Sequence, residues 1–409
     1  MTELGPVLIA GGGIGGLTLG LALAREGIAS TILERAEVFS ESGAGIQLGP
    51  NAVRVLQNLG VAAPLAPMIA CPQAITLLDG PSGTPLARLP LGAWISHRHG
   101  APYWVARRAD LQTALLAVAH GSPLIEIVTA FHVERFEERG KEICVFSKDG
   151  RMARGALLVG ADGQWSTVRQ RLWPGRALAF TGMTAARALL PAEAVPCPSS
   201  EPVTSVWLAP RCHVVRYPVR GGAEMAVVVI ASDQWDRRGW SAAADREAVL
   251  DKLAPFTPKL RKVLSSARDW RKWALYEHTP LEHWSRGRAT LLGDAAHPIL
   301  PFLAQGGAMA IEDAATLAAV LAAHQPDAVG ALLRYEHLRR RRVSRVQSAS
   351  RTNGRIYHLA GPLAAARNLV LKNVPGGLIM SRYDWLYGWK ASYCPSQYLV
   401  AAHPNARQE

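Results

Sequence analysis

The feature that most constrains this chain is a glycine-rich turn between a short apolar run and a helix-like segment near its start. Residues 6–10 are apolar without a break, as in a buried parallel strand, and Gly11-Gly12-Gly13-Ile14-Gly15-Gly16 follows at once. Residues 17–25 then predict a helix, and residues 29–34 predict a second strand. A strand, glycine turn, helix and strand in this order provide the context that a dinucleotide-binding fingerprint needs.

Each glycine of this turn has a physical role in such a fingerprint. Gly11 permits the tight turn, Gly13 lets the backbone approach a pyrophosphate, and Gly16 allows the helix to pack closely on the strand. The N–H groups that open the helix face the phosphates. We therefore predict that Gly11, Gly13, Gly15 and Gly16 contact a dinucleotide.

Glu34 ends the second predicted strand, where a carboxylate can accept hydrogen bonds from ribose hydroxyls. A carboxylate there also disfavours a 2′-phosphate, because like charges would meet. At this point FAD and NAD fit the pattern equally well.

Two later segments place an aspartate beside glycine at the end of a predicted strand. The first is Gly160-Ala161-Asp162-Gly163, followed by Ser166 as a predicted N-cap of a helix. The second is Gly293-Asp294, where Asp294 suits the ribityl hydroxyls of a flavin. Such turns also occur without a ligand, but their order after the first fingerprint indicates FAD.

A rigid loop follows Asp294, and a helix is predicted from about residue 308 to 323. The start of a helix carries partial positive charge and free N–H groups, which would stabilise negative charge on a reduced flavin ring. Pro298, Gly306 and Gly307 in this loop are therefore predicted to lie against the flavin.

Taken together, these segments relate the chain to a known family. It resembles the single-component FAD-dependent aromatic hydroxylases (class A flavoprotein monooxygenases), especially the salicylate and 3-hydroxybenzoate hydroxylase branch. The resemblance extends to about residue 345 and is carried by four segments: residues 43–52 (Gly43-Ala44-Gly45-Ile46-Gln47-Leu48-Gly49-Pro50-Asn51-Ala52), Arg108-Ala109-Asp110-Leu111, Asp162-Gly163 and residues 293–314. The chain has Arg107 and Ala186 where the family often has histidine and an aromatic residue.

The resemblance implies a fold and a set of contacts with FAD. The expected fold is α/β: a Rossmann-like FAD-binding domain (residues 1–72, 100–178 and 278–345) interwoven with an α+β substrate domain built on an antiparallel sheet (73–99 and 179–277), and a C-terminal helical and aromatic segment (346–409). The residues that would contact FAD by resemblance are Glu34, Arg35, Gln47, Arg108, Gln112, Asp162 and Asp294.

The candidate catalytic residues lie in the predicted sheet and in the loop before residue 308. His213 and Tyr217 are four apart, so on one strand they share a face, which by resemblance points into the substrate cavity. His213 could accept a phenolic proton, Tyr217 could donate or relay a hydrogen bond, and Gln305 could hold the substrate hydroxyl or a water. A core histidine, a packing tyrosine and a loop-stabilising glutamine are the alternatives.

Two further residues are candidates for binding substrate. Arg187 could clamp a carboxylate through two hydrogen bonds, whereas alternation places Arg216 on the face opposite Tyr217. A solvated arginine is the alternative for each. Tyr103 is a candidate by resemblance alone.

The activity implied by the resemblance is hydroxylation of a small phenolic or heteroaromatic carboxylate. NADH or NADPH would act as a transient reductant, and O2 would form a hydroperoxide on the reduced flavin. One alternative is a flavin reductase or dehydrogenase that acts on a larger ring without inserting oxygen. A non-enzymatic alternative is a nucleotide-binding protein with a basic interaction surface.

Composition and charge indicate the classes of binding partner and the cellular location. The net charge of +13 and the pI near 9.9 fit attraction of anionic ligands, since no recognised nucleic-acid module accompanies them. Five scattered cysteines without metal-ligand spacing predict a reduced protein without a disulfide framework or a metal site. The lack of an export signal predicts a cytoplasmic location. Apolar stretches interrupted by Gly, Pro or charge predict that no segment spans a membrane.

Two features of the C-terminal third are interpreted less specifically. The run Arg339-Arg340-Arg341-Arg342 is interpreted as a solvated helix face rather than a nucleic-acid tag. The rings of Tyr383, Trp385, Tyr387, Trp389 and Tyr393 could pack on the body of the protein or against a second subunit of a homodimer.

Overall fold

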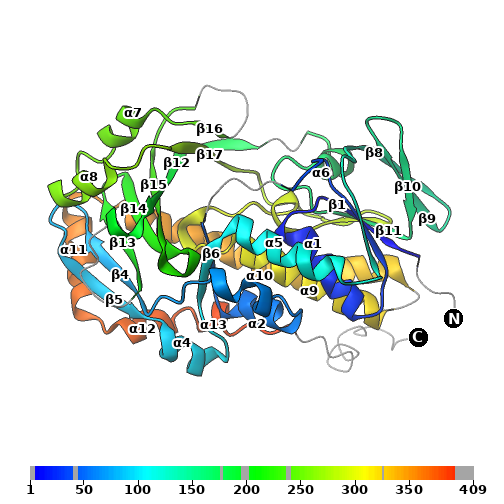
Figure 1. Ribbon diagram of the computed structural model, residues 1–409, viewed down its shortest axis with the longest axis horizontal. Helices are drawn as coiled ribbons and strands as arrows, with labels where there is room; N and C mark the ends of the chain where they lie inside the picture. The colour runs from blue at the N-terminus through cyan, green and yellow to red at the C-terminus, as the bar shows by residue number, and fades with distance from the viewer. Residues whose placement is uncertain are drawn as a thin grey trace, which may run out of the picture.

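A five-stranded parallel sheet forms one end of the molecule (Figure 1). The computed structural model describes residues 5–39, 45–175, 178–194, 202–235, 241–324 and 327–391. The sheet has the order β18-β11-β1-β2-β7, with β1 at Val7–Ala10, β2 at Ser30–Leu33, β7 at Ile125–Val128, β11 at Leu157–Gly160 and β18 at Ala289–Leu291. The central strands are buried on both faces, as their unbroken apolar sequences predict. The glycine turn after β1 and the Gly293-Asp294 pair after β18 therefore both lie at the carboxyl ends of parallel strands.

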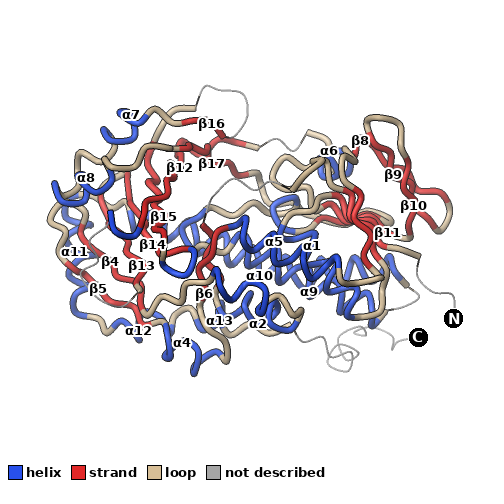
Figure 2. Tube along the Cα trace, viewed as in Figure 1, coloured by secondary structure: helices blue, strands red, loops and turns tan. Residues whose placement is uncertain are grey.

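Three helices pack together beside the parallel sheet. They are α1 (Ile14–Arg25), α5 (Arg108–His120) and α9 (Gly306–Ala323). Among the described helices, α9 has the length and apolar composition of a membrane span, but 61% of that window is buried inside the protein. It contacts α1 and α10 (Ala328–Tyr357), so its apolar residues form part of the core. The three-stranded sheet β8 (Val133–Arg139), β9 (Glu142–Ser147) and β10 (Met152–Gly155) projects from this end (Figure 2).

An eight-stranded sheet forms the other end of the molecule (Figures 1 and 2). Its order is β16-β17-β12-β15-β14-β13-β4-β5, antiparallel throughout except that β13 and β4 run parallel. The strands are β4 (Ala74–Asp79), β5 (Pro85–Pro90), β12 (Ala179–Pro191), β13 (Val203–Ala209), β14 (Cys212–Val219), β15 (Glu224–Ser232), β16 (Ser241–Ala243) and β17 (Arg271–Glu277). The segment at 74–91 thus joins the sheet, as expected.

Alternation along the strands gives this sheet two different faces. One face packs with Val249, Phe256 and Leu260, which come from α7 (Arg246–Asp251), the turn after it and α8 (Pro258–Leu264), in a separate apolar cluster. The other face, which includes Tyr217 and Val228, belongs to the same core as the parallel sheet. The second face is therefore the side on which a site shared by both sheets can form.

The remaining described elements lie around and between the two sheets. They are β3 (Gly45–Leu48) paired with β6 (Trp104–Arg107), the helices α2 (Pro50–Asn58), α3 (Ala62–Leu65), α4 (Gly92–His99), α6 (Thr167–Leu172), α11 (Gly361–Asn373), α12 (Gly376–Ser381) and α13 (Asp384–Tyr387), and the 3-10 turns η1 (Ala66–Met68), η2 (Ala192–Ala194), η3 (Arg220–Gly222), η4 (Gly293–Ala295) and η5 (Pro301–Leu303). The 30-residue α10 reaches from β18, where the Tyr335 hydroxyl donates to Leu291, to β14, where His358 meets His213.

Candidate functional site

The glycine turn after β1 has the shape that a pyrophosphate cradle requires. Gly11 has φ +106, and a Cβ placed on it would lie 2.6 Å from the carbonyl oxygen of Ala161. A Cβ on Gly16 would overlap the carbonyl oxygen of Gly11, so this glycine allows α1 to approach the turn. By contrast, nothing lies within 4 Å of a Cβ on Gly13. Gly13 therefore borders open space in front of the N-terminus of α1, where a phosphate would fit.

Two of the predicted FAD contacts converge on Gly12. The Glu34 carboxylate accepts from the Gly12 amide at 2.6 Å and from the Ala36 amide at 2.9 Å. The Gln112 amide donates to the Gly12 carbonyl at 3.2 Å. Arg35, predicted beside them, has an exposed side chain. Glu34 and Gln112 therefore brace the glycine turn from two sides, in addition to any contact with a ligand.

Asp162 and Asp294 occupy different environments. One oxygen of Asp162 accepts from the amides of Thr167 and Val168 at 2.7 and 3.1 Å, and Ser166 caps the same helix, α6, as predicted. Asp162 thus ties the turn after β11 to α6, while its other oxygen is buried without a partner among the described residues.

Asp294 lies near the start of α9. A Cβ on Gly306 would be 3.9 Å from an Asp294 carboxylate oxygen, so two predicted FAD contacts are adjacent. Burial raises the pKa of Asp294, and the charges of Arg108 and His297 oppose that rise. A half-buried carboxyl beside a helix N-terminus is suited to accept hydrogen bonds from ligand hydroxyls.

Residues of β3, β12 and β14, with Tyr103 just before β6, lie on the side of the large sheet that shares a core with the parallel sheet. The Tyr103 hydroxyl donates to the Gln47 side chain at 2.9 Å. Tyr217 packs so closely on Gly45 that a Cβ there would overlap its ring. Burial raises the pKa of Tyr103 and of Tyr217, so both phenols stay protonated and can donate.

Arg187 lies on the same face of the sheet as Tyr217. Its guanidinium stacks over Trp273, 4.9 Å from the ring centroid, and its Nε is buried without a hydrogen-bond partner. Burial lowers the pKa of Arg187, Tyr217 opposes this effect, and the positive charge of Arg108 adds to it. Within the described residues Arg187 forms no ion pair, which distinguishes it from a solvated arginine. Arg216 lies on the opposite face, over Trp207, as alternation predicts.

His213 is buried and belongs to a pair of imidazoles. Its Nδ1 lies 2.8 Å from Nε2 of His358, which follows α10, and the rings of Phe302 and Tyr357 lie 5.7 and 5.3 Å away. Burial lowers the pKa of His213 well below 6.5, and the same cause lowers that of His358 to about 4. The pair is therefore neutral at neutral pH, so one nitrogen of the contact donates and the other accepts.

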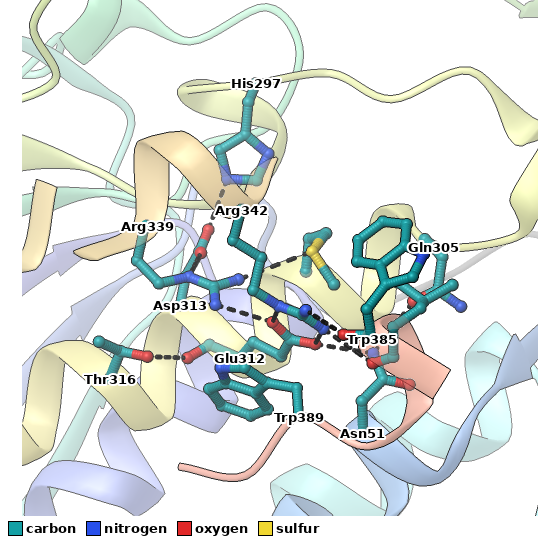
Figure 3. Close-up of polar contacts among 12 residues, drawn as sticks. Asn51, His297, Gln305, Glu312, Asp313, Thr316, Arg339, Arg342, Trp385 and Trp389 are labelled. Carbon is teal, nitrogen blue, oxygen red and sulfur yellow. Dashed lines mark hydrogen bonds and ion pairs between the residues drawn. The ribbon is translucent and has the colours of Figure 1, made fainter. Parts of the chain in front are cut away.

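Gln305 precedes α9 and is completely buried (Figure 3). Its Oε1 accepts from Asn51 Nδ2 at 3.0 Å, and the same Asn51 nitrogen donates to Glu312 Oε1 at 2.7 Å. The Gln305 nitrogen is buried and has no partner among the described residues. Gln305 is thus bonded not to its own loop but to α2, which is a different structural role from the loop-stabilising alternative.

Glu312 and Asp313, consecutive on α9, are the centre of a buried ion network. Arg339 bonds to Glu312 at 2.7 Å and to Asp313 at 2.6 Å, and Arg342 bonds to Glu312 at 2.6 Å. Asp313 also accepts from the Gly293 amide at 3.0 Å and contacts His297 at 2.6 Å. Burial alone would raise the pKa of Asp313, but His297 and Arg339 outweigh it and lower that pKa to about 2.

This network corrects the interpretation of the arginine run as a solvated face. Arg339 is 1% exposed and the side chain of Arg342 is 13% exposed, because residues three apart on α10 face α9 together. Arg341, between them, is exposed. The network ties the second turn of α9 to the Gly293 turn, so the run contributes to the same end of the molecule as the predicted flavin site.

The C-terminal aromatic rings pack on this network. Trp389 lies 5.3 and 5.5 Å from the guanidinium carbons of Arg339 and Arg342, and Trp385 lies 3.9 Å from that of Arg345. These rings pack on the body of the protein, while Tyr393 lies outside the described residues. Contact with a second subunit stays a prediction.

The residues present fit a flavin dinucleotide. The open space at Gly13, the half-buried Asp294 and the unpartnered amide nitrogen of Gln305 lie at the phosphate, ribityl and ring ends that such a ligand would occupy. The sequence pattern named Gly13, Asp294 and Gln305 as candidates, but it did not name Asn51, Glu312, Asp313, Arg342 or His358, which the structure places beside the candidate residues.

Comparison with known proteins agrees with this geometry. Residues 5–350 match the model of the FAD binding domain family. The chain is 35% identical to a 3-hydroxybenzoate 6-hydroxylase of Polaromonas naphthalenivorans over 95% of this chain and 97% of the relative. It is 38% identical to a 3-amino-4-hydroxybenzoate 2-monooxygenase of Streptomyces platensis, over 94% and 96%. A crystal structure of Klebsiella pneumoniae HpxO with FAD and uric acid superposes with a TM-score of 0.80 at 26% identity, covering 92% of this chain and 95% of that one.

The family model spans most of the chain, and the relatives are similar over nearly their whole length. Their chemistry is that of FAD-dependent aromatic hydroxylases, and the two-sheet fold is the same. This chain belongs to the FAD-binding family of aromatic hydroxylases and is a FAD-dependent monooxygenase of the 3-hydroxybenzoate hydroxylase branch.

Proposed function

We propose that this protein uses NADH or NADPH and O2 to hydroxylate a small aromatic carboxylate that carries a phenolic hydroxyl or a heteroaromatic equivalent. The observation that carries the proposal is an arginine without an ion-pair partner among the described residues, on the same sheet face as a neutral histidine. Arg187 and His213 both project from the face that shares a core with the FAD-binding end. The relatives named above act on hydroxybenzoates, which have both groups.

Arg187 supports an anionic substrate. Arg187 is half-buried and has no counter-ion among the described residues, so a carboxylate that binds its guanidinium through two hydrogen bonds would stabilise it. Tyr217, kept protonated by burial, can donate to the same substrate. These contacts would fix the orientation of the ring, and with it the ring carbon presented to the cofactor.

His213 supports activation of the phenol. The lowered pKa leaves its imidazole neutral, so it can accept a hydrogen bond from the substrate hydroxyl and hold the proton as the ring becomes electron-rich. The bound flavin supplies the redox and oxygen chemistry. The apolar sheet excludes water from the space between the two ends.

The test is aerobic NAD(P)H oxidation by the purified holoprotein with a panel of hydroxybenzoates and hydroxypyridine carboxylates, with peroxide measured alongside. Each acid is paired with the phenol that lacks its carboxylate. We expect one or more acids to accelerate NAD(P)H oxidation with little peroxide and with a hydroxylated product, and their paired phenols to act weakly. NAD(P)H oxidation that proceeds equally without O2 would support the reductase alternative.

Several predictions stay open alongside this proposal. Any loss of the carboxylate depends on the pose of the substrate, while the ring position and the NADH or NADPH preference stay predictions. A cytoplasmic location and a homodimer also stay predictions.

A further inference from the structure

A chain of buried hydrogen bonds runs from two arginines of α10 to the amide of Gln305 (Figure 3). Only one assignment of donors and acceptors satisfies every link. Its links are Arg339 and Arg342, Glu312, Asn51 and Gln305. The direction of each link determines the next, so the orientation of the Gln305 amide follows from groups on α2, α9 and α10.

The first links determine the orientation of Asn51. The Glu312 carboxylate receives hydrogen bonds from Arg339 and Arg342, and a carboxylate has only acceptor oxygens. The Asn51 atom 2.7 Å from Glu312 Oε1 must therefore be the amide nitrogen. The opposite amide orientation would place two oxygens at that distance, which is repulsive.

The last link determines the orientation of Gln305. The Asn51 nitrogen has two hydrogens, one for Glu312 and one for the Gln305 atom at 3.0 Å, which must therefore be Oε1. The Gln305 NH2 group then points away from the network, completely buried and without an acceptor among the described residues. A buried donor in this condition is costly unless a ligand accepts from it.

We infer that Asn51, held by Glu312, is a positioning residue that presents the Gln305 NH2 group as a hydrogen-bond donor to an oxygen of the bound ring system. That oxygen is either a carbonyl of the flavin ring or the phenolic oxygen of the substrate, which have the same acceptor chemistry. The inference rests on the proposed function only for the second source. Asn51 touches neither ligand and acts through Gln305.

The test is a double-mutant cycle of Asn51→Leu and Gln305→Met in the full chain. Binding of FAD is measured by reconstitution of the apoprotein without substrate, and binding of 3-hydroxybenzoate is measured from the flavin absorbance of the holoprotein. Each single variant should weaken one of these affinities about three- to tenfold, the effect of one hydrogen bond. The double variant should be no weaker than Gln305→Met alone, because both changes remove the same bond.

The two binding measurements identify the source of the acceptor. Loss of FAD affinity assigns the acceptor to the flavin, and loss of 3-hydroxybenzoate affinity with unchanged FAD affinity assigns it to the substrate. The FAD measurement requires no turnover, so its outcome is independent of whether the proposed reaction is right. Losses that multiply in the double variant, or single variants with unchanged affinities for both ligands, would overturn the inference.

Two further variants separate positioning from folding. Asn368→Leu is the matched control, because Asn368 also donates to a carboxylate, that of Asp79 at 2.9 Å, on an edge region of the large sheet. It should lower thermal stability and leave both affinities unchanged. If Asn51→Leu does not fold, Glu312→Gln replaces it in the cycle. The amide introduced at position 312 can present either its oxygen or its nitrogen to Asn51, so we expect a smaller loss of affinity than for Asn51→Leu. This loss should again disappear when Gln305→Met is already present.

Discussion

His213 Nδ1 lies 2.8 Å from His358 Nε2, so the candidate base is one half of a hydrogen-bonded imidazole pair. One ring comes from a central strand of the large sheet, and the other follows the longest helix of the described chain. If Nδ1 of His213 donates in this contact, its Nε2 keeps the lone pair that can accept a phenolic proton. With that direction of the hydrogen bond, His358 selects the tautomer in which His213 can act.

Removing the His213 imidazole should uncouple NAD(P)H oxidation from hydroxylation, so that peroxide forms in place of product. In His213→Asn we expect product formation from the best acid to fall about 10²-fold, the usual contribution of one general base. His358→Asn should cause a smaller loss, because it leaves the His213 tautomer unselected. This loss should grow as the pH falls, because the charge of His358 no longer lowers the pKa of His213. Product and peroxide are measured together from pH 6 to 9. Equal product yield in His213→Asn and in the exposed control His337→Asn would contradict the base role.

The imidazole pair should also make stability depend on pH. Burial lowers the pKa of His358 to about 4 and that of His213 well below 6.5, so both bind protons more readily in the unfolded chain. Their contribution to the unfolding free energy is complete above about pH 6.5 and is lost as the pH falls from 6.5 toward 4. We expect a loss of roughly 1–2 kcal/mol, given the partial exposure of His358.

Urea unfolding at several pH values measures this loss. A His213→Gln/His358→Gln variant should show a flatter dependence of the unfolding free energy on pH across the same window. The same slope in the variant and in the original protein would assign the pH dependence to other groups.

Arg187→Met should weaken the binding of acids but not of the phenols that lack the carboxylate. The KM for a stimulating acid should rise about 10²-fold, because a buried two-bond ion pair is lost, while that of its paired phenol should change little. Without substrate the variant should be about as stable as the original protein, since the half-buried charge and its stacking on Trp273 are removed together. Steady-state kinetics and thermal unfolding test both parts, with the exposed Arg261→Met as control. An equal KM increase for acid and phenol would contradict carboxylate binding.

Two glycines of the first turn should respond in opposite ways to the same substitution. Nothing lies within 4 Å of a Cβ on Gly13, so Gly13→Ala should fold normally and bind FAD at least tenfold more weakly through contact with the pyrophosphate. A Cβ on Gly16 would overlap the Gly11 carbonyl, so Gly16→Ala should lose about 1–3 kcal/mol of stability. Thermal unfolding of the apoprotein and FAD titration distinguish the two. Normal FAD affinity in Gly13→Ala would exclude the proposed phosphate position.

Local patterns were enough to predict the turns and the faces of strands. The glycine turn, the Ser166 cap and the shared face of His213 and Tyr217 depend on neighbours within a few residues, where spacing and side-chain chemistry decide the outcome. The family resemblance then placed these segments around one ligand.

Contacts between distant segments were not predictable in the same way. Asn51 and Glu312 are 261 residues apart, and His213 and His358 are 145 apart, so no periodicity relates them. One signal was present in the sequence: Glu312 and Asp313 interrupt an apolar helix, and buried carboxylates need cationic partners. The spacing of three between Arg339 and Arg342 offered such partners, but the run was interpreted by its charge alone.

The packing of Trp385 and Trp389 on the arginines of α10 has a consequence for biosynthesis. The glycine turn leaves the ribosome first, yet the ion network that ties α9 to the Gly293 turn is covered by side chains made about 370 residues later. A nascent chain can therefore form the phosphate end of its pocket long before the ring end is rigid. We expect tight capture of the flavin to be a late, post-translational event, and a chain that stops before Trp385 to hold the cofactor loosely.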